Sequence, residues 1–351
     1  MLAGMDIQVA DNTGRTADAV DTARMSGVSP FQPGGRAVVG RFAPSPSGRM
    51  HLGNVFSALV AWLSARSQGG RIVLRIEDLD ERTRSGPWAD LLIEDLQWLG
   101  LYWDEGPYYQ SEREELYQDA FDRLVGMDLV YPCFCTRAEL HAASAPHTSD
   151  GTPIYAGTCR GLTPEQVAER SRVRPPAQRL RVPGEGDPEG LIEFEDRAYG
   201  LQSSELARDC GDFLVRRSDG VFAYQLAVVV DDEDMGITEV VRGRDLLEST
   251  ARQIYLQELL GYGRPVYAHV PLLVAPEGRR LSKRDRDSGM GDLRERFGSP
   301  ERMLGWLAYG TGLAPDAAPR SAEQLAELFS WDLISTHRSD IVIDGGVFAK
   351  A

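Results

Sequence analysis

The sequence predicts an α/β protein in which a doubly wound parallel sheet is interrupted by an insertion and followed by a short helical segment. A short apolar run at 37–40 precedes a loop rich in proline, serine and glycine, and apolar residues then recur at helical spacing over 55–66. A second apolar run, at 72–77, reads as the next strand. The segment 130–210, rich in proline, glycine and arginine, breaks this alternation and therefore indicates an insertion between two halves of one sheet.

These patterns divide the chain into five segments. They are 1–35, an extension expected to be disordered; 36–129, the first half of the sheet domain; 130–210, the insertion; 211–298, the second half; and 299–351, a C-terminal helical segment. Within the last segment, amphipathic patterns predict helices over 300–313 and 321–329.

Composition narrows the class of protein. At 351 residues, with 42% hydrophobic and 26% charged residues, the chain has the make-up of an ordinary globular protein. No apolar stretch approaches the ~20 residues that span a bilayer, and the start lacks signal-peptide features, so a cytoplasmic location is expected. The net charge of −15 disfavours a general nucleic-acid binder, although an acidic protein can still present a local arginine-lined face.

The loop between the first predicted strand and helix has the features of a phosphate site. At the start of a helix, unpaired backbone N–H groups and the positive end of the dipole favour anions. Gly48 and Gly53 let a ligand approach the backbone closely, and His51 can donate a hydrogen bond to a phosphate oxygen. Taken alone, such a glycine-containing loop is also typical of a plain turn.

Lysine is almost absent from the chain. Its two lysines, Lys283 and Lys350, stand against thirty-six arginines, and Lys350 is the penultimate residue. Lys283 lies in a short basic segment, 280–284, after the apolar run 269–274. A lysine is a compact mobile charge suited to phosphate oxygens, whereas arginine is a planar fork. Lys283 is therefore a candidate for phosphate chemistry, the alternative being an ordinary surface lysine.

Together these segments resemble the paired signatures of class I aminoacyl-tRNA synthetases. The segment HLGN at 51–54 is similar to the HIGH signature, and the segment RLSKR at 280–284 is similar to the KMSKS signature. The string RFAPSPSG at 41–48 resembles the glutamyl branch of that class. The resemblance runs from about 37 to about 310 and departs from the signatures at Asn54, Arg280 and Arg284.

The resemblance implies a Rossmann-like nucleotide-binding sheet and an ATP-dependent ligase. It implies His51 and Lys283 as catalytic residues, ATP as a substrate and Mg²⁺ as its companion ion. The residues implied for ATP binding are His51, Gly53, Asn54, Ser282 and Lys283.

The pocket also needs groups that recognise an amino acid. Arg41 and Glu77 lie at the ends of the first and second predicted strands, at the edge where open α/β sheets bind ligands. Each candidate also has an ordinary structural explanation. Glu77 could face solvent, and Arg242 could simply pair with Asp245. Tyr224, which is placed where a turn leads into a strand, could be a core phenol. The resemblance implies glutamate binding by Arg41, Phe42, Ala43, Pro44, Ser45, Glu77, Tyr224 and Arg242.

Three cysteines are grouped in the predicted insertion. CFC at 133–135 is followed by nineteen residues and then YAGTC at 155–159. Without an export signal, this grouping favours a structural zinc site with four ligands over disulfides. The fourth ligand could be Tyr155, His147, His141 or Cys210, with a histidine favoured by ligand chemistry alone. Three reduced, buried thiols without metal are the alternative.

The tyrosine-containing spacing resembles the zinc site of glutamyl-Q tRNA(Asp) synthetases. That resemblance implies Cys133, Cys135, Tyr155 and Cys159 as ligands and leaves Cys210 as a core thiol. Because the sequence ends shortly after the second predicted C-terminal helix, we expect no counterpart of the anticodon-reading domain of full-length glutamyl-tRNA synthetases. Both features are expected of this truncated branch, whose members attach glutamate to queuosine at the wobble position of tRNA(Asp).

The implied partners are L-glutamate, ATP and queuosine-bearing tRNA(Asp), with no membrane and no obligate protein partner. Three other functions stay open at this point. A minimal glutamyl-tRNA synthetase would esterify the tRNA 3′ end, and a free-standing ligase would glutamylate a small amine or a carrier protein. A non-catalytic, zinc-containing RNA-binding module would retain the fold without turnover, which the presence of His51, Lys283, Arg41 and Glu77 disfavours.

Overall fold

The computed structural model describes residues 37–141, 154–279, 289–336, 338–344 and 347–348. The predicted extension 1–35, the alternative ligand His147, and the predicted site residues Ser282 and Lys283 lie outside the described residues.

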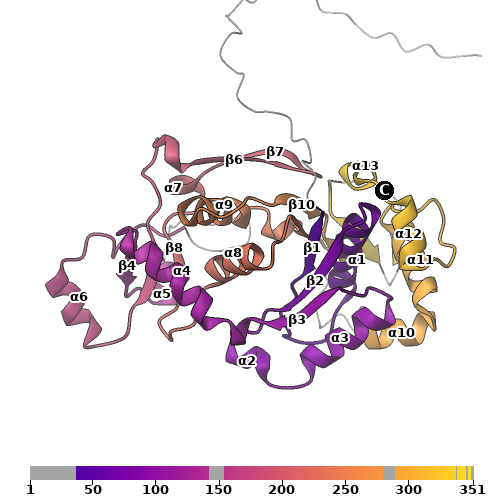
Figure 1. Cartoon of the computed structure of the whole chain (residues 1–351), viewed down its shortest axis with the longest axis horizontal. Helices are drawn as coiled ribbons and strands as arrows, with labels where there is room; N and C mark the ends of the chain where they lie inside the picture. The colour runs from indigo at the N-terminus through magenta and orange to yellow at the C-terminus, as the bar shows by residue number, and fades with distance from the viewer. Residues whose placement is uncertain (1–36, 142–153, 280–288, 337, 345–346, 349–351) are drawn as a thin grey trace, which may run out of the picture. The chain divides into compact units, whose positions relative to one another are not determined.

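Two neighbouring sets of parallel strands form the centre of the described structure (Figure 1). The first half is β1 (Val39–Phe42), β2 (Arg71–Ile76) and β3 (Glu105–Tyr109), and the second half contains β9 (Glu239–Gly243) and β10 (Val266–Val270). The two halves meet where β1 lies beside β9: Val39 donates its N–H to Thr238 Oγ1 at 2.8 Å and accepts the N–H of Thr238 at 2.9 Å. The predicted doubly wound sheet is confirmed, with its switch point between β1 and β9.

Successive strand residues bury themselves on opposite faces of this sheet. On β2, Ile72, Leu74 and Ile76 join one core, whereas Val73 joins the other. This alternation follows from the two-residue period of a strand, and both faces are apolar because helices cover both. The covering helices are α1 (Leu52–Ser67), α3 (Trp88–Trp98) and α11 (Pro300–Gly310) for the first core, and α4 (Glu114–Gly126), α8 (Tyr224–Asp234) and α9 (Ser249–Leu260) for the second.

A separate antiparallel sheet lies in and just beyond the predicted insertion. It has the order β4 (Val130–Cys133), β5 (Ala177–Leu180), β8 (Phe213–Arg216), and the nearby helices are α5 (Arg137–His141) and α6 (Pro164–Ser171). β8 begins three residues after the predicted boundary at 210. The division of the chain into the five segments stays a prediction.

A hairpin from the same region joins the parallel sheet. It consists of β6 (Leu191–Asp196) and β7 (Gly200–Glu205), and β6 pairs in parallel with β10 through Asp196 and Tyr267. The resulting strand order is β7-β6-β10-β9. The inserted chain is thus anchored directly to the second half of the sheet.

The segment after Ala223 is a helix, which corrects the prediction that Tyr224 enters a strand. The valine-rich run of α8 resembles a buried strand, yet each side of this helix is covered, so apolar residues recur without a polar face. Its Asp231 is fully buried and accepts hydrogen bonds from Gln110 at 2.7 Å, Arg113 at 2.7 Å and Tyr117 at 2.9 Å. These contacts satisfy a carboxylate that only the folded helix places there.

The C-terminal segment contains the expected helices and also two strands that the periodicity did not indicate. Its elements are α11, α12 (Ala322–Leu328), α13 (Trp331–Ser335), β12 (Ile341–Asp344) and β13 (Val347–Phe348), and α10 (Met290–Phe297) directly precedes it. Ser299 and Ser321 cap α11 and α12 with their side-chain oxygens. β12 pairs in parallel with β11 (Leu273–Val274), so this late strand packs beside the segment that follows β10.

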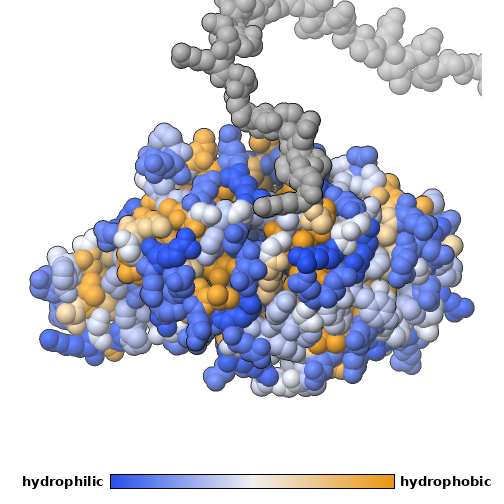
Figure 2. Space-filling model, in the orientation of Figure 1, coloured by the Kyte–Doolittle hydropathy of each residue, from blue (hydrophilic) through white to orange (hydrophobic). Residues whose placement is uncertain are grey.

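The remaining short elements are α2 (Glu81–Arg84), α7 (Leu206–Asp209) and the 3-10 turns at Gln110–Glu112, Pro188–Gly190 and Arg244–Leu246. On the face drawn in Figure 2, hydrophilic residues predominate and apolar ones form scattered patches. Within the described ranges, no helix combines the length and apolar character needed to cross a membrane.

Candidate active site

A cavity of about 550 Å³ opens where the C-terminal ends of β1, β2 and β9 meet α1 and the first turn of α8. This is the edge at which open α/β sheets bind ligands, and the volume suits a small-molecule site. The structure brings together all the described residues that were predicted for glutamate and ATP. The lining includes Arg41, Phe42, Ala43, Pro44, Ser45, His51, Gly53, Asn54, Glu77, Tyr224 and Arg242.

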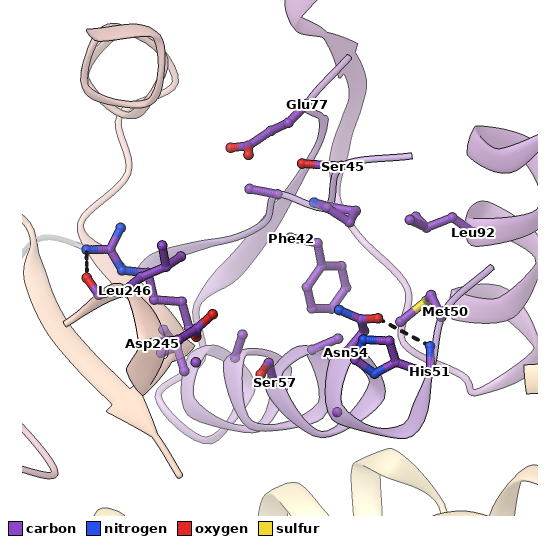
Figure 3. Close-up of a pocket in the computed structure, with 18 of the residues that line it drawn as sticks. Phe42, Ser45, Met50, His51, Asn54, Ser57, Glu77, Leu92, Asp245 and Leu246 are labelled. Carbon is purple, nitrogen blue, oxygen red and sulfur yellow. Dashed lines mark hydrogen bonds between the residues drawn. The ribbon is translucent and has the colours of Figure 1, made fainter. Parts of the chain in front are cut away.

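One side of the cavity is the N-terminus of α1. His51 immediately precedes the helix, and its backbone N–H donates to Asn54 Oδ1 at 3.2 Å (Figure 3). A Cβ atom on Gly53 would come within 3.1 Å of the His51 ring. Glycine at this position therefore avoids a close contact and lets the ring pack against the helix end. The arrangement presents an imidazole and a helix N-terminus to the same space, which suits a phosphate group.

Residues next to the second signature reach the same loop. Met290 donates its backbone N–H to the Met50 carbonyl at 3.0 Å, and Gly289 forms a bridge with His51. On the other flank, Leu272 and Leu273 line the cavity. The residues directly after 280–288 therefore contact lining residues of the cavity, and the chain also lines the cavity at Leu272 and Leu273, shortly before that segment.

Arg41 supplies a buried cation with spare hydrogen-bond donors. Its side chain is 5% exposed; Nη1 donates to the Val241 carbonyl at 3.0 Å, and Nε lies 3.7 Å from Asp232 Oδ1. Among the described residues Nε has no hydrogen-bond partner. Burial lowers the pKa of Arg41, and Asp232 opposes that shift. An unpaired donor on a buried guanidinium is costly, so this group fits an anionic ligand.

Glu77 supplies a carboxylate on the opposite side from α1, close to Ser45 (Figure 3). It accepts a hydrogen bond from Arg75 Nη2 at 3.3 Å, and burial raises the pKa of Glu77 although Arg75 and Arg41 counteract this. Arg75 is fully buried and also donates to Asp232 Oδ1 at 2.7 Å. Since Asp232 in turn contacts Arg41, the pair Arg75 and Asp232 holds both lining charges in place.

Arg242 and Tyr224 complete the charged wall. The Arg242 guanidinium donates to His269 Nε2 at 3.0 Å, Gln253 Oε1 at 2.8 Å and Thr250 Oγ1 at 2.8 Å. Burial raises the pKa of Tyr224, so its hydroxyl stays protonated. Two guanidinium groups, one carboxylate and one phenol around a single cavity suit a ligand that carries carboxylates and an ammonium group.

Sequence reasoning missed several lining residues. Ser57 lies one turn along α1 from Gly53, and Asp245, Leu246 and Leu272 lie in the loops after β9 and β10. The signal that placed Arg41 and Glu77, a position just after a parallel strand, applies equally to Asp245 and Leu272.

The three predicted cysteines form one cluster outside this cavity. The Sγ atoms of Cys133, Cys135 and Cys159 lie within 4.8 Å of one another and could hold a metal ion. The Tyr155 hydroxyl is 3.5 Å from Cys133 Sγ and 3.7 Å from Cys135 Sγ. Cys210 packs in the second apolar core instead, and the side chain of His141 lies outside the description.

The spacing of these four donors can be compared with a metal tetrahedron. Zinc bonds of about 2.3 Å to sulfur and about 2.1 Å to oxygen separate two sulfurs by roughly 3.8 Å and sulfur from oxygen by roughly 3.6 Å. Cys135 Sγ and Cys159 Sγ are 3.7 Å apart, and both tyrosine–cysteine distances lie near the second value. Arg179 Nε donates to Cys133 Sγ at 3.3 Å, as suits a thiolate ligand. The donor set therefore fits a four-coordinate ion.

Comparison with known families identifies the protein family of this chain. The family described as "tRNA synthetases class I (E and Q), catalytic domain" matches residues 37–309. The chain belongs to this family. Family membership confirms the predicted synthetase-like ligase class, and ATP as a substrate fits it.

Curated relatives match over most of their length. The glutamyl-Q tRNA(Asp) synthetase of Symbiobacterium thermophilum is 49% identical over 323 residues, 88% of this chain and 97% of the relative. The enzyme of the same name from Nitratidesulfovibrio vulgaris is 45% identical, over 85% of this chain and 93% of the relative.

Among solved structures, the chain is similar in fold to two glutamate-tRNA synthetases. The glutamate-tRNA synthetase from Elizabethkingia anophelis superposes with a TM-score of 0.73 at 27% identity, over 88% of this chain and 68% of that structure. A glutamate tRNA ligase from Elizabethkingia meningosepticum, solved with its amino acid, gives a TM-score of 0.70 at 28% identity, over 85% of this chain and 66% of that structure.

Proposed function

We propose that this protein activates L-glutamate with ATP and transfers it to the queuosine base at the wobble position of tRNA(Asp). The observation that carries the first half is that one cavity is lined both by Arg41, whose Nε has no hydrogen-bond partner among the described residues, and by the Glu77 carboxylate. An arginine fork suits the side-chain carboxylate of glutamate, and a carboxylate suits its ammonium group. Arg242 and Tyr224 close the same wall, and the main chain and side chains of Phe42, Ala43, Pro44 and Ser45 enclose the ligand.

In the first step, the α-carboxylate of glutamate attacks the α-phosphorus of ATP, forming glutamyl-adenylate and releasing pyrophosphate. The protein contributes positioning and charge stabilisation, and no covalent intermediate with the chain is required. His51, Gly53 and Asn54 at the N-terminus of α1 hold the triphosphate, and Ser282 and Lys283 follow the departing pyrophosphate. Mg²⁺ accompanies the nucleotide.

In the second step, a nucleophilic group on queuosine attacks the activated carbonyl carbon, and AMP leaves. The acceptor rests on the names of the relatives that match this chain over nearly their whole length. A tRNA 3′ end is the acceptor in the second candidate function, a minimal glutamyl-tRNA synthetase, which the likeness to the glutamate-tRNA synthetase structures favours. A cytoplasmic location stays a prediction.

The cysteine cluster is assigned a structural zinc ion. Cys133, Cys135, Cys159 and Tyr155 would hold it, and bound zinc would fix the fold of the segment that carries them. The cluster lies outside the cavity lined by Arg41 and Glu77, so the ion takes no part in either chemical step.

Glutamate-dependent exchange of pyrophosphate into ATP, measured without RNA, tests the activation step. The expected result is exchange with L-glutamate and at least a hundredfold less with L-aspartate or L-glutamine at equal concentration. Equal exchange with glutamine would contradict the assignment of Arg41 and Arg242 to a carboxylate.

A further inference from the structure

A buried histidine–aspartate pair stands directly behind the cavity. His269 on β10 and Asp196 at the end of β6 are 0% and 1% exposed, and His269 Nδ1 lies 2.6 Å from Asp196 Oδ2. The other ring nitrogen, Nε2, lies 3.0 Å from Arg242 Nε. Neither His269 nor Asp196 lines the cavity, so the pair does not touch the ligand.

Hydrogen-bond chemistry fixes the tautomer of this histidine. Arginine Nε is always a donor, so the His269 nitrogen that faces it must be an acceptor. The proton of the neutral ring then sits on Nδ1 and is donated to Asp196. The environment keeps the ring neutral, because burial lowers the pKa of His269 to about 4, with Asp196 opposing and Arg242 adding to the shift.

Asp196 is itself held rigidly. Its Oδ1 accepts the backbone N–H groups of Ala198 at 3.0 Å, Tyr199 at 3.0 Å and His269 at 3.3 Å. The carboxylate therefore cannot rotate without losing several partners, and it presents Oδ2 to the ring in one direction.

The hydrogen bonds of the Arg242 guanidinium can also be assigned donor by donor. Nε donates to His269, one Nη1 hydrogen goes to Gln253, and Nη2 donates to Thr250 at 2.8 Å and to the Leu246 carbonyl at 3.3 Å. Among the described residues this occupies four of the five N–H donors of a guanidinium. The one that remains, on Nη1, belongs to a group that lines the cavity.

We propose that Asp196 and His269 are positioning residues that fix the guanidinium plane of Arg242 and aim its one spare N–H at the carboxylate of the bound amino acid. This proposal rests on the proposed function and names how one of its contacts is set. Because Asp196 ends the strand of the inserted hairpin, the orientation of Arg242 is tied to the docking of that hairpin on β10.

Two amides of different length test the proposal. In His269→Gln the side-chain amide reaches the position of Nε2 and can offer an oxygen to Arg242, whereas in His269→Asn it reaches only the position of Nδ1 and the Asp196 side. We expect the KM for glutamate in pyrophosphate exchange to rise about tenfold or more in His269→Asn and less than about threefold in His269→Gln, with the KM for ATP changed little in both.

A third variant tests the tautomer. Asp196→Asn keeps the size of the side chain and its Oδ1 acceptor, but it presents an N–H to the ring and favours a proton on Nε2, opposite Arg242. We expect it to raise the KM for glutamate as His269→Asn does. Tyr131→Phe is the matched control, since it also removes a 2.6 Å hydrogen bond to a buried carboxylate, Asp212, away from the cavity.

The outcomes separate the possible failures. If His269→Gln and His269→Asn raise the KM for glutamate equally, or if only thermal unfolding temperatures change, the pair is merely structural and the proposal is wrong. If the unaltered protein shows no glutamate-dependent exchange at all, the proposed function fails first. In that case, direct binding of glutamate to the three variants, measured by calorimetry, still decides the positioning role.

Discussion

Met290 donates its backbone N–H to the carbonyl oxygen of Met50 at 3.0 Å, and so the residue before the first signature segment is hydrogen-bonded to a residue shortly after the second. Asp95 reinforces this contact from a fully buried position. Its carboxylate accepts Arg49 Nη2 at 3.1 Å and lies 2.7 Å from Arg294 Nη2, joining the loop before α1 to α10. The loop before α1, proposed to bind phosphate, and the start of α10 are therefore joined by direct contacts.

Lys283 belongs to the second signature segment and lies outside the described residues; its proposed role can be tested by mutation. If Lys283 stabilises the departing pyrophosphate, Lys283→Ala lowers the glutamate activation rate by about 100-fold or more while glutamate binding changes little. The chain provides its own control in Lys350→Ala, its other lysine. Single-turnover formation of glutamyl-adenylate measures the rate, and equal rates for the two variants would exclude the role.

Arg41 is expected to dominate recognition of the amino acid. Arg41→Ala removes a charged fork whose hydrogen bonds to a carboxylate contribute about 1.5–3 kcal/mol each, so kcat/KM for glutamate should fall by about 100-fold or more. Arg208→Ala, which removes an arginine whose side chain is 63% exposed, serves as the control in the same exchange assay. A loss of similar size in both variants would point to a general effect of charge.

Glu77 gives the site a pH dependence. Burial raises the pKa of Glu77 from its ordinary value, although Arg75 and Arg41 oppose the shift. As pH falls toward that raised pKa, Glu77 takes up a proton and can no longer pair with an ammonium group. The KM for glutamate should therefore rise on acidification, starting at a higher pH than an ordinary glutamate side chain would cause.

The isosteric variant Glu77→Gln separates this group from other titrations. Its KM for glutamate should be higher at neutral pH and should vary less with pH than that of the unaltered protein. Parallel pH profiles for the two proteins would assign the titration to another group.

The metal assignment can be tested on the four cysteines. The purified protein should contain about one zinc per chain by elemental analysis, and Cys135→Ser should lose it, whereas Cys210→Ser should retain it. Tyr155→Phe removes only the hydroxyl and should weaken zinc retention against a chelator. Full retention in Tyr155→Phe would remove the tyrosine oxygen from the ligand set.

Much of the fold could be predicted because its signals are local. The strand–loop–helix pattern around His51 and the acidic end of β2 at Glu77 place residues at one sheet edge through topology alone. The helix at Tyr224 could not be read in this way. Its valines favour a strand, and the decisive contacts of Asp231 come from Gln110, Arg113 and Tyr117, more than a hundred residues away in sequence.

The sequence also did not predict the two charged residues that support the site, Arg75 and Asp232. In the sequence, Arg75 is one residue of a predicted strand and Asp232 one of several acidic residues at 231–234, yet their side chains meet at 2.7 Å behind Arg41 and Glu77. No spacing rule links positions 75 and 232, because long-range packing alone brings them together. The strand β12 was missed for the same reason: its partner β11 lies far back in the chain.

The central claim concerns the acceptor, and one measurement addresses it most directly. Labelled glutamate and ATP are supplied with tRNA from queuosine-containing cells and with tRNA from queuosine-free cells, and the labelled fragment is identified after nuclease digestion. The account predicts label only in the queuosine-containing preparation, on the anticodon fragment of tRNA(Asp). Label on the 3′ terminal adenosine of both preparations would contradict it and make this protein a minimal glutamyl-tRNA synthetase.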